Sequence, residues 1–153
     1  LPHYIVCGKG PLENELKTQV DSLGLTTFFH FTGFCPDIPS YLAAADIFVQ
    51  VPIFEGLGVS VIEALAAGLP VVCSRVGGIP ELVKHEQTGL LVPPQDPASL
   101  ETALIRLLNN PAWAKNVGAV GQKMVREKFG IEKTVRANES LYYELTEKPS
   151  NKH

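Results

Sequence analysis

The stretch IFEGLGVSVIEALAAGLPVV, residues 53–72, runs from a loop through a helical segment into the start of a strand. A helix that begins near Gly58 would end before Gly68, because glycine commonly follows a helix C-terminus. Two glutamates, Glu55 in the loop and Glu63 in the helix, interrupt this almost wholly apolar segment. An unpaired carboxylate among apolar side chains is costly, so we expect both glutamates to meet polar groups.

Outward from this stretch, short apolar runs alternate with helical patterns along the chain. The expected strands lie within residues 3–7, 26–33, 46–51, 70–74 and 89–92. This alternation predicts β-α units and a mostly parallel sheet. The strands read as continuous apolar runs, which is typical of sheets covered by helices on both faces. The predicted fold class is therefore α/β, a Rossmann-like three-layer αβα arrangement.

The C-terminal half carries helix signals of its own. Asp96 is placed as an N-cap, Pro97 as the first helical residue, and Asn109-Asn110-Pro111 as the end of the helix. The apolar stripe of this helix comprises Leu100, Ala103, Leu104, Leu107 and Leu108. Helical spacing continues to about residues 129–130, and a last helix precedes a polar tail. We expect one domain over residues 1–147 and a tail at 148–153.

Composition excludes several classes of protein. The chain has 153 residues and a net charge of -3, and it has no run of Lys or Arg, so a nucleic-acid partner has no electrostatic support. Cys7, Cys35 and Cys73 stand far apart in sequence, which argues against a disulfide framework and a zinc site and fits a reducing compartment. No apolar run reaches the ~20 residues of a membrane-spanning helix, so we expect a soluble, cytoplasmic protein.

Three pairs of glycines follow expected strands: Gly8 and Gly10, Gly56 and Gly58, and Gly77 and Gly78. Strand-to-helix junctions of a parallel sheet lie at its carboxyl edge, where open α/β folds bind ligands. Glycine lets backbone N–H groups approach a phosphate, so a nucleotide is the expected ligand. Each pair could equally form only a tight turn. NAD is disfavoured, because Glu13 replaces the third glycine of the dinucleotide fingerprint.

The two glutamates of the opening stretch bracket one predicted site. Val59, Ile62, Glu63 and Ala66 fall along one stripe at helical spacing, so Glu63 would interrupt a packing face. Glu55 would lie near the positive end of the helix, beside the glycines. A nucleotide diphosphate sugar there would offer hydroxyl groups to both carboxylates. The alternative is that Glu55 caps the helix electrostatically and Glu63 faces solvent.

The stretch EGLGVSVIEALAAGLPVVCSRVGGIPELV, residues 55–83, resembles the E-x(7)-E signature of retaining glycosyltransferases with the GT-B fold, family 4, the glycosyl transferases group 1. YIVCGKGPLENELK and FTGFCPDIPSYLAAADIFVQ upstream, and TGLLVPPQDPASLETALIRLL downstream, resemble the same family in the same order. The likeness covers roughly residues 4–130. It implies that this chain is the C-terminal, donor-binding half of a GT-B architecture.

The resemblance implies a role for each matching residue. Glu55 would contact hydroxyls of the donor sugar and is the catalytic candidate, and Glu63 would contact the ribose. The loop Gly56, Leu57, Gly58 and Val59 would face the sugar and diphosphate, with Gly8 and Gly10 as further phosphate contacts. Gly33, Phe34, Cys35 and Asp37 would form the nucleobase pocket. The implied donor is a UDP- or GDP-sugar, used without a bound metal.

The chain also departs from the family pattern. Pro52 stands three residues before Glu55, where the family often has Pro-Ser four before, and Leu57 replaces the commoner Phe. The acceptor-binding N-terminal domain and the first βα unit of the donor half do not precede Leu1, so we expect a chain truncated at its N-terminus. Such a chain would bind donor weakly and transfer little sugar, because transfer needs both halves of the cleft. The full enzyme could associate peripherally with the cytoplasmic face of a membrane.

Three alternatives remain open at this point. The chain could be a catalytically silent nucleotide-binding module or subunit, and the upstream coding sequence would decide this. It could belong to a nucleotide-sugar epimerase, which product analysis with and without acceptor would reveal. It could be a plain interaction domain, in which case it would bind no nucleotide.

Overall fold

The computed structural model describes residues 1–147, so the predicted tail at 148–153 lies outside the described residues. The elements follow in the order β1 (Tyr4–Cys7), α1 (Glu13–Ser22), β2 (Phe29–Gly33), α2 (Ile38–Ala44), β3 (Phe48–Gln50), α3 (Val59–Ala66), β4 (Val71–Ser74), α4 (Ile79–Leu82), β5 (Leu90–Val92), α5 (Pro97–Asn109), α6 (Pro111–Phe129) and α7 (Ile131–Glu147). The chain divides after Tyr41, within α2, into two compact units. The assignment of residues 1–147 to one nucleotide-sugar-binding domain stays a prediction.

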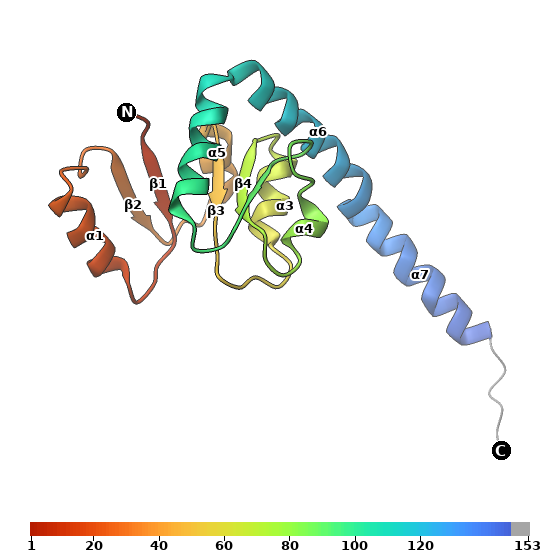
Figure 1. Cartoon of the computed structure of the whole chain (residues 1–153). Coiled ribbons are helices and arrows are strands. Elements are labelled where there is room, and N and C mark those ends of the chain that lie inside the picture. Colours follow the sequence, from red (N-terminus) through yellow and green to blue (C-terminus); the bar gives the residue numbers. More distant parts are fainter. Residues whose placement is uncertain (148–153) are drawn as a thin grey trace. The chain divides into compact units, whose positions relative to one another are not determined.

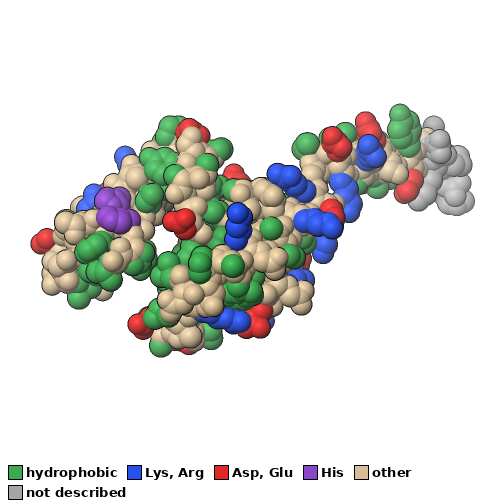
Figure 2. Space-filling view, turned by 90° about the horizontal axis from the view of Figure 1, so that it is seen from above, with side chains coloured by type: hydrophobic (Ala, Val, Ile, Leu, Met, Phe, Trp, Pro, Cys, Tyr) green, Lys and Arg blue, Asp and Glu red, His purple; other side chains and the backbone are tan. Residues whose placement is uncertain are grey.

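The first unit, residues 1–41, is built on a parallel pair of strands, β1 and β2. The rings of Tyr4 and Phe29 stack across the pair with centroids 4.6 Å apart. His3 and His30 also stack, at 5.2 Å, and Figure 2 shows histidine side chains gathered on one face. Cys35 is the one buried residue of this unit. Cross-strand contacts therefore carry much of its packing, since it has almost no core.

The second unit, from residue 42 onward, contains a three-stranded parallel sheet in the order β3-β4-β5. Helix α5 lies over one face of this sheet, and α3 and α4 lie over the other (Figure 1). Every residue of β4 and β5 is buried, as expected for strands covered on both faces. The predicted α/β fold with parallel strands and layered helices is confirmed.

Alternation along β4 divides the core of the second unit in two. Val71 and Cys73 join the cluster formed with α3 and α4, whereas Val72 joins the cluster formed with α5. Side chains of a strand point alternately to opposite faces, so one strand of four residues supplies both clusters. The strand β5 behaves likewise, with Leu91 on the α3 side and Leu90 on the α5 side. This double coverage fixes β4 at the centre of the unit.

Helix α3 has a different buried face from the one predicted. Val61, Ala64 and Leu65 are its buried residues, whereas Glu63 is exposed and Val59 is 59% exposed. The predicted packing stripe through Val59, Ile62, Glu63 and Ala66 was therefore wrong. Apolar residues occupy almost every position of this short helix, so periodicity alone did not distinguish its inner side from its outer side.

The end of α3 is held by a glycine and by α6. Gly68 adopts φ 83°, and its N–H donates to the carbonyl of Leu65 at 2.9 Å, which confirms the predicted glycine cap. A Cβ on Gly118 of α6 would lie 2.2 Å from the carbonyl oxygen of Gly68. Gln122 of α6 donates to the carbonyl of Ala66 at 2.8 Å. Close helix packing therefore anchors the C-terminal end of α3.

The remaining C-terminal helices differ in what they cover. The predicted cap of α5 is confirmed, because Asp96 accepts a hydrogen bond from the N–H of Ser99 at 3.0 Å. Helix α6 contributes buried Val117 and Val125 to the unit. All side chains of α7 whose burial is described are exposed, Val135 and Tyr142 included. No helix within residues 1–147 combines the length and apolarity needed to cross a membrane.

Candidate functional site

Glu55 lies in the loop between β3 and α3, at the carboxyl end of the second unit's sheet. One of its carboxylate oxygens accepts from Nε2 of Gln50 at 2.8 Å, and the other accepts from the backbone N–H of Gly58 at 3.3 Å. The hydroxyl of Ser60 donates to the amide oxygen of Gln50. The half-buried Glu55 therefore meets the polar partners that its apolar surroundings required.

The N-terminus of α3 gives this loop its electrostatic character. Gly58 occupies the N-cap position with φ 78°. As a glycine it has no side chain that could accept hydrogen bonds from the first N–H groups of the helix. The first N–H groups of a helix have no acceptor within the helix, and they carry partial positive charge. The Glu55 carboxylate binds one such donor, at Gly58. The neighbouring backbone can therefore receive a second anionic group.

Two glycines after β4 support the backbone of the Glu55 loop. The N–H of Gly78 donates to the carbonyl of Gly56 at 2.9 Å. A Cβ on Gly77, whose φ is 51°, would lie 1.7 Å from the carbonyl oxygen of Glu55. Only glycine therefore fits at position 77. This third pair of glycines acts through the Glu55 loop, since its residues contact that loop directly.

A buried hydroxyl holds the beginning of the same loop. Ser74, the last residue of β4, is fully buried, and its Oγ donates to the carbonyl of Pro52 at 2.6 Å. The loop is thus fixed to β4 on one side and to the glycine turn on the other. Its own apolar side chains point outward, with Ile53, Phe54 and Leu57 exposed.

Glu63 occupies a different environment from Glu55. It lies on the exposed side of α3, and within residues 1–147 its carboxylate has no side-chain hydrogen bond or ion pair. The polar contact expected for this glutamate is therefore not made by the chain itself. Its carboxylate is available to a ligand or to water.

The first unit brings several of its predicted site residues together. The N–H of Gly8 donates to the carbonyl of Gly33 at 2.8 Å, so the ends of β1 and β2 meet there. Gly10 accepts from the N–H of Glu13, and no atom outside its chain neighbours lies within 4 Å of a Cβ placed on it. Gly8, a predicted phosphate contact, and Gly33, a predicted base contact, thus lie side by side where β1 and β2 end.

The other predicted base-pocket residues differ in exposure. Phe34 is 76% exposed and Cys35 is 8% exposed. Asp37 accepts from the N–H of Ser40 at 3.3 Å and from the Ser40 hydroxyl, so it caps the start of α2. Of Phe34, Cys35 and Asp37, only Phe34 has an aromatic ring, and this exposed ring is free to stack on a base.

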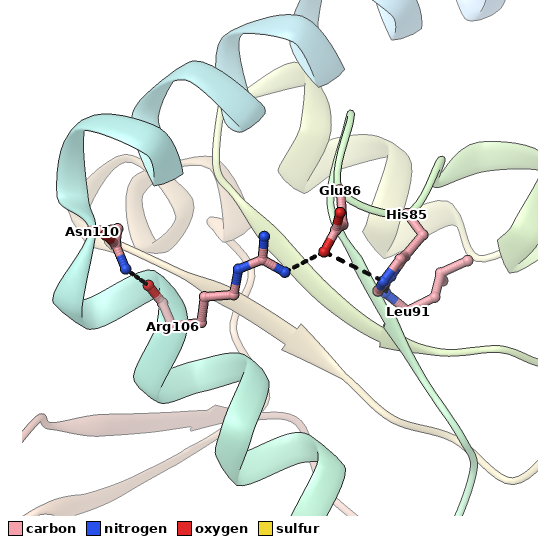
Figure 3. A network of polar contacts seen from close by, with 5 residues as sticks. All are labelled: His85, Glu86, Leu91, Arg106 and Asn110. Atoms are coloured by element: carbon pink, nitrogen blue, oxygen red, sulfur yellow. Dashed lines mark hydrogen bonds and ion pairs between the residues drawn. The ribbon is translucent and has the colours of Figure 1, made fainter.

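The second unit also has a surface cavity that none of the predicted site residues lines. Its volume is about 410 Å³, and its walls come from β5, α5 and the turn at His85. Arg106 pairs with Glu86 there, and the ring of His85 accepts from the N–H of Leu91 at 3.0 Å (Figure 3). The Arg106 guanidinium lowers the pKa of Glu86. The guanidinium also stacks on Trp113, so its charge is already satisfied.

With this geometry established, comparison with known proteins assigns the chain to a family. Residues 2–124 match the family model described as "Glycosyl transferases group 1". The chain belongs to this family. Membership confirms the resemblance drawn from residues 55–83.

Relatives with established names support the assignment. The chain is 34% identical to the 2-deoxystreptamine glucosyltransferase of Streptomyces kanamyceticus, over 84% of this chain and 34% of that protein. It is 34% identical to the lipopolysaccharide core mannosyltransferase LpsB of Rhizobium meliloti, over 92% of this chain and 42% of that protein. This chain therefore spans about a third to two fifths of the length of these relatives.

Solved structures share the fold. The sucrose-phosphate synthase of Thermosynechococcus elongatus superimposes with a TM-score of 0.85 and 33% identity, over 93% of this chain and 38% of that one. Anabaena Alr3699/HepE, whose crystal structure contains UDP-glucose, gives 0.84 and 27%, over 94% and 40%. The fold is thus one half of a GT-B glycosyltransferase, as predicted.

Four residues position Glu55 or its loop in a way that was not predicted from the sequence. Gln50 and Ser74 hold Glu55 and its loop, yet neither was singled out. Gly77 and Gly78 were expected either to approach a ligand or to form a turn; they lie in a turn, and this turn packs against the loop backbone. A usable signal was present, because Gln50 and Ser74 are polar residues that each end an apolar strand at the carboxyl edge, where open α/β sheets bind ligands.

Proposed function

We propose that this chain binds the nucleotide diphosphate sugar donor of a hexosyl transfer that retains configuration. The single observation that carries the proposal is the position of the Glu55 carboxylate, which is held at the N-terminus of α3 by Gln50 and Gly58. A diphosphate placed there meets backbone N–H groups and the positive end of the helix. The carboxylate beside it accepts hydrogen bonds from sugar hydroxyls.

Further contacts are proposed for each unit by itself. The loop residues Gly56, Leu57, Gly58 and Val59 face the sugar and diphosphate, and Glu63 binds the ribose hydroxyls with its unpaired carboxylate. In the first unit, Gly8 and Gly10 contact phosphate. Gly33, Phe34, Cys35 and Asp37 border the base. UDP-glucose in the structure of Alr3699/HepE supports a uridine donor as the first one to test, with GDP-sugars second.

The acceptor binds to an N-terminal domain that belongs to the full-length enzyme, and that enzyme works at the cytoplasmic face of a membrane or in the cytoplasm. Donor breakdown uses no bound metal, because backbone N–H groups and the helix terminus stabilise the departing diphosphate. The 153-residue chain alone therefore binds donor but transfers little sugar. Rapid glycosyl transfer by the purified chain would contradict this part of the proposal.

Calorimetric titration of the chain with UDP and with UDP-glucose tests the assigned roles. Glu55→Ala should weaken UDP-glucose binding about tenfold or more, the loss expected for a hydrogen bond to a charged group, and should affect UDP less. Glu63→Ala should weaken both ligands equally, because the ribose is common to them. Glu101→Ala, an exposed glutamate of α5, is the matched control and should change neither.

Two results would overturn the assignment. Equal losses for UDP and UDP-glucose in Glu55→Ala would remove Glu55 from the sugar site. Failure of the wild-type chain to bind UDP-, GDP- or ADP-sugars would exclude donor binding by this chain.

A further inference from the structure

The three cysteines of the chain lie in three different environments. Cys7 ends β1 and is exposed, Cys35 follows β2 and is buried, and Cys73 lies inside β4. Burial raises the pKa of Cys73 to about 12, so its thiol is unreactive in the folded protein. Cys7 and Cys35 are distant in sequence, but the parallel pairing of β1 and β2 brings their strand ends together, with Cys7 opposite Gly33.

Two hydrogen-bonded bridges join Cys35 to the residues on either side of Cys7. The hydroxyl of Thr32 donates to the carbonyl of Val6 at 3.2 Å and lies 2.9 Å from Sγ of Cys35. The carbonyl of Gly33 accepts from the N–H of Gly8 at 2.8 Å and from Sγ of Cys35 at 3.4 Å. Through Thr32 and Gly33, the sulfur of Cys35 is therefore connected to Val6 and Gly8, the two chain neighbours of Cys7, and it lies beside Cys7.

The electrostatics give the two thiols different roles. The Thr32 hydroxyl, the Cys7 thiol, the Tyr41 hydroxyl and the Gly8 N–H all stabilise a negative charge on Cys35 and lower its pKa. Partial burial and the nearby Cys35 raise the pKa of Cys7. Cys35 is thus the sulfur whose thiolate form the surroundings stabilise better. A thiol of lowered pKa next to a second, resolving thiol is a common arrangement of redox-sensitive cysteines.

We propose that Cys7 and Cys35 form a reversible intramolecular disulfide that joins the ends of β1 and β2 and weakens donor binding. The effect on binding rests on the proposed function, because Gly33 to Cys35 border the base and Gly8 contacts phosphate. The disulfide itself does not rest on it.

The chemistry requires a small hydroperoxide as oxidant. The Cys35 thiolate attacks the peroxide, the O–O bond breaks, and the released alkoxide or hydroxide takes a proton, which leaves Cys35 as a sulfenic acid. The Cys7 sulfur then attacks the Cys35 sulfur, and the sulfenic oxygen leaves as water with the proton of Cys7. Two thiols and one peroxide are thereby converted to one disulfide, one alcohol or water, and one further water.

Disulfide formation must move the segment that borders the base. A disulfide holds its sulfurs about 2 Å apart, closer than two unbonded thiols can approach, so Cys35 and Cys7 have to draw together. The turn at Gly33 is in the left-handed region, with φ 68°, and Phe34 next to it is largely exposed. Phe34 has little packing to resist the movement, so much of the displacement falls on it.

The test treats the reduced chain with a small excess of hydrogen peroxide and maps its peptides by mass spectrometry. We expect a mass decrease of two hydrogen atoms and a peptide pair that links Cys7 to Cys35, both reversed by dithiothreitol. Cys7→Ser should prevent the link, whereas Cys73→Ala should still form it. Sulfinic or sulfonic acid on Cys35 without a link, or a link only between chains, would overturn the proposal.

Titration with UDP then measures the consequence for binding. Oxidation should weaken UDP binding by about tenfold, a usual magnitude for coupling between two sites. Cys7→Ser should bind UDP as the reduced wild type does before peroxide, and dithiothreitol should restore the affinity of the oxidised wild type. Unchanged UDP affinity in the linked protein would overturn the regulatory part. A chain that forms the link but never binds UDP would instead refute the proposed function, so the two failures are distinguishable.

Discussion

The two parallel sheets of this chain are built with the same strand pairing but very different packing. In β4 and β5 every residue is buried between α5 on one face and α3 with α4 on the other. In β1 and β2 no residue is fully buried. Parallel pairing alone therefore does not make a core, and burial on both faces does.

This difference explains how the candidate site is held in each unit. The Glu55 loop is fixed by groups that the buried sheet supplies, namely Ser74 at the end of β4 and Gly77 with Gly78 just after it. In the first unit the equivalent strand ends are joined by a few hydrogen bonds around Thr32 and Gly33. The Glu55 loop is therefore held by more buried groups than the strand ends of the first unit are.

The largest expected effect comes from removing the same side chain in both units. Leu65 of α3 has 0% exposure, whereas Leu16 of α1 is 44% exposed. Leu65→Ala should lower the free energy of unfolding by about 3 kcal/mol, because it leaves a cavity in the core. Leu16→Ala should cost below about 1 kcal/mol, since little apolar area is lost. Urea denaturation followed by circular dichroism measures both, and similar costs would refute the contrast in packing.

A smaller effect is expected from adding a methyl group to one glycine in each unit. Gly77→Ala should destabilise the chain by about 1–3 kcal/mol, because the new Cβ would collide with the carbonyl of Glu55. It should also weaken UDP-glucose binding by displacing Glu55. Gly10→Ala is the control for stability, since its Cβ would meet open space. A Gly77→Ala chain with wild-type stability and affinity would show that the Glu55 loop does not depend on this contact.

Much of the fold followed from the sequence because its signals are local. The strand positions, the Asp96 cap and the Gly68 cap each rest on a few neighbouring residues, and the structure confirms them. The family was also recognisable, because its motifs occur in order along most of the chain.

The inner face of α3 and the contact of Gly77 with the Glu55 loop could not be predicted, because both depend on contacts between distant segments. Val61 and Leu65 face inward only because β4 and α6 lie on that side, while Val59 and Ala66 look equally apolar in sequence. The contact between Gly77 and Glu55 joins two loops after different strands. The spacing of residues in the sequence does not reveal such contacts between distant segments.

The smallest expected effect concerns helix capping, which also differs between the units. Asp96 caps α5 through Ser99, whereas the residue at the same position of α1, Leu12, offers no side-chain acceptor. The Ser99 hydroxyl and N–H lower the pKa of Asp96 below its unfolded value of about 3.9. The cap therefore contributes stability that is fully present above this unfolded pKa and is lost as the pH falls through the lower, folded pKa.

Substitution of Asp96 separates the cap from its charge. Asp96→Ala should lower Tm at pH 7 by less than Leu65→Ala does, because a cap hydrogen bond is lost but no cavity forms. Asp96→Asn keeps an acceptor oxygen, so it should retain most of the Tm and lose the part of the acid sensitivity that Asp96 contributes. Thermal unfolding between pH 2 and 7 measures both. If Asp96→Asn and the wild type lose Tm in parallel as pH falls, the titration of Asp96 does not couple to folding, and the cap acts through a hydrogen bond that its charge does not strengthen.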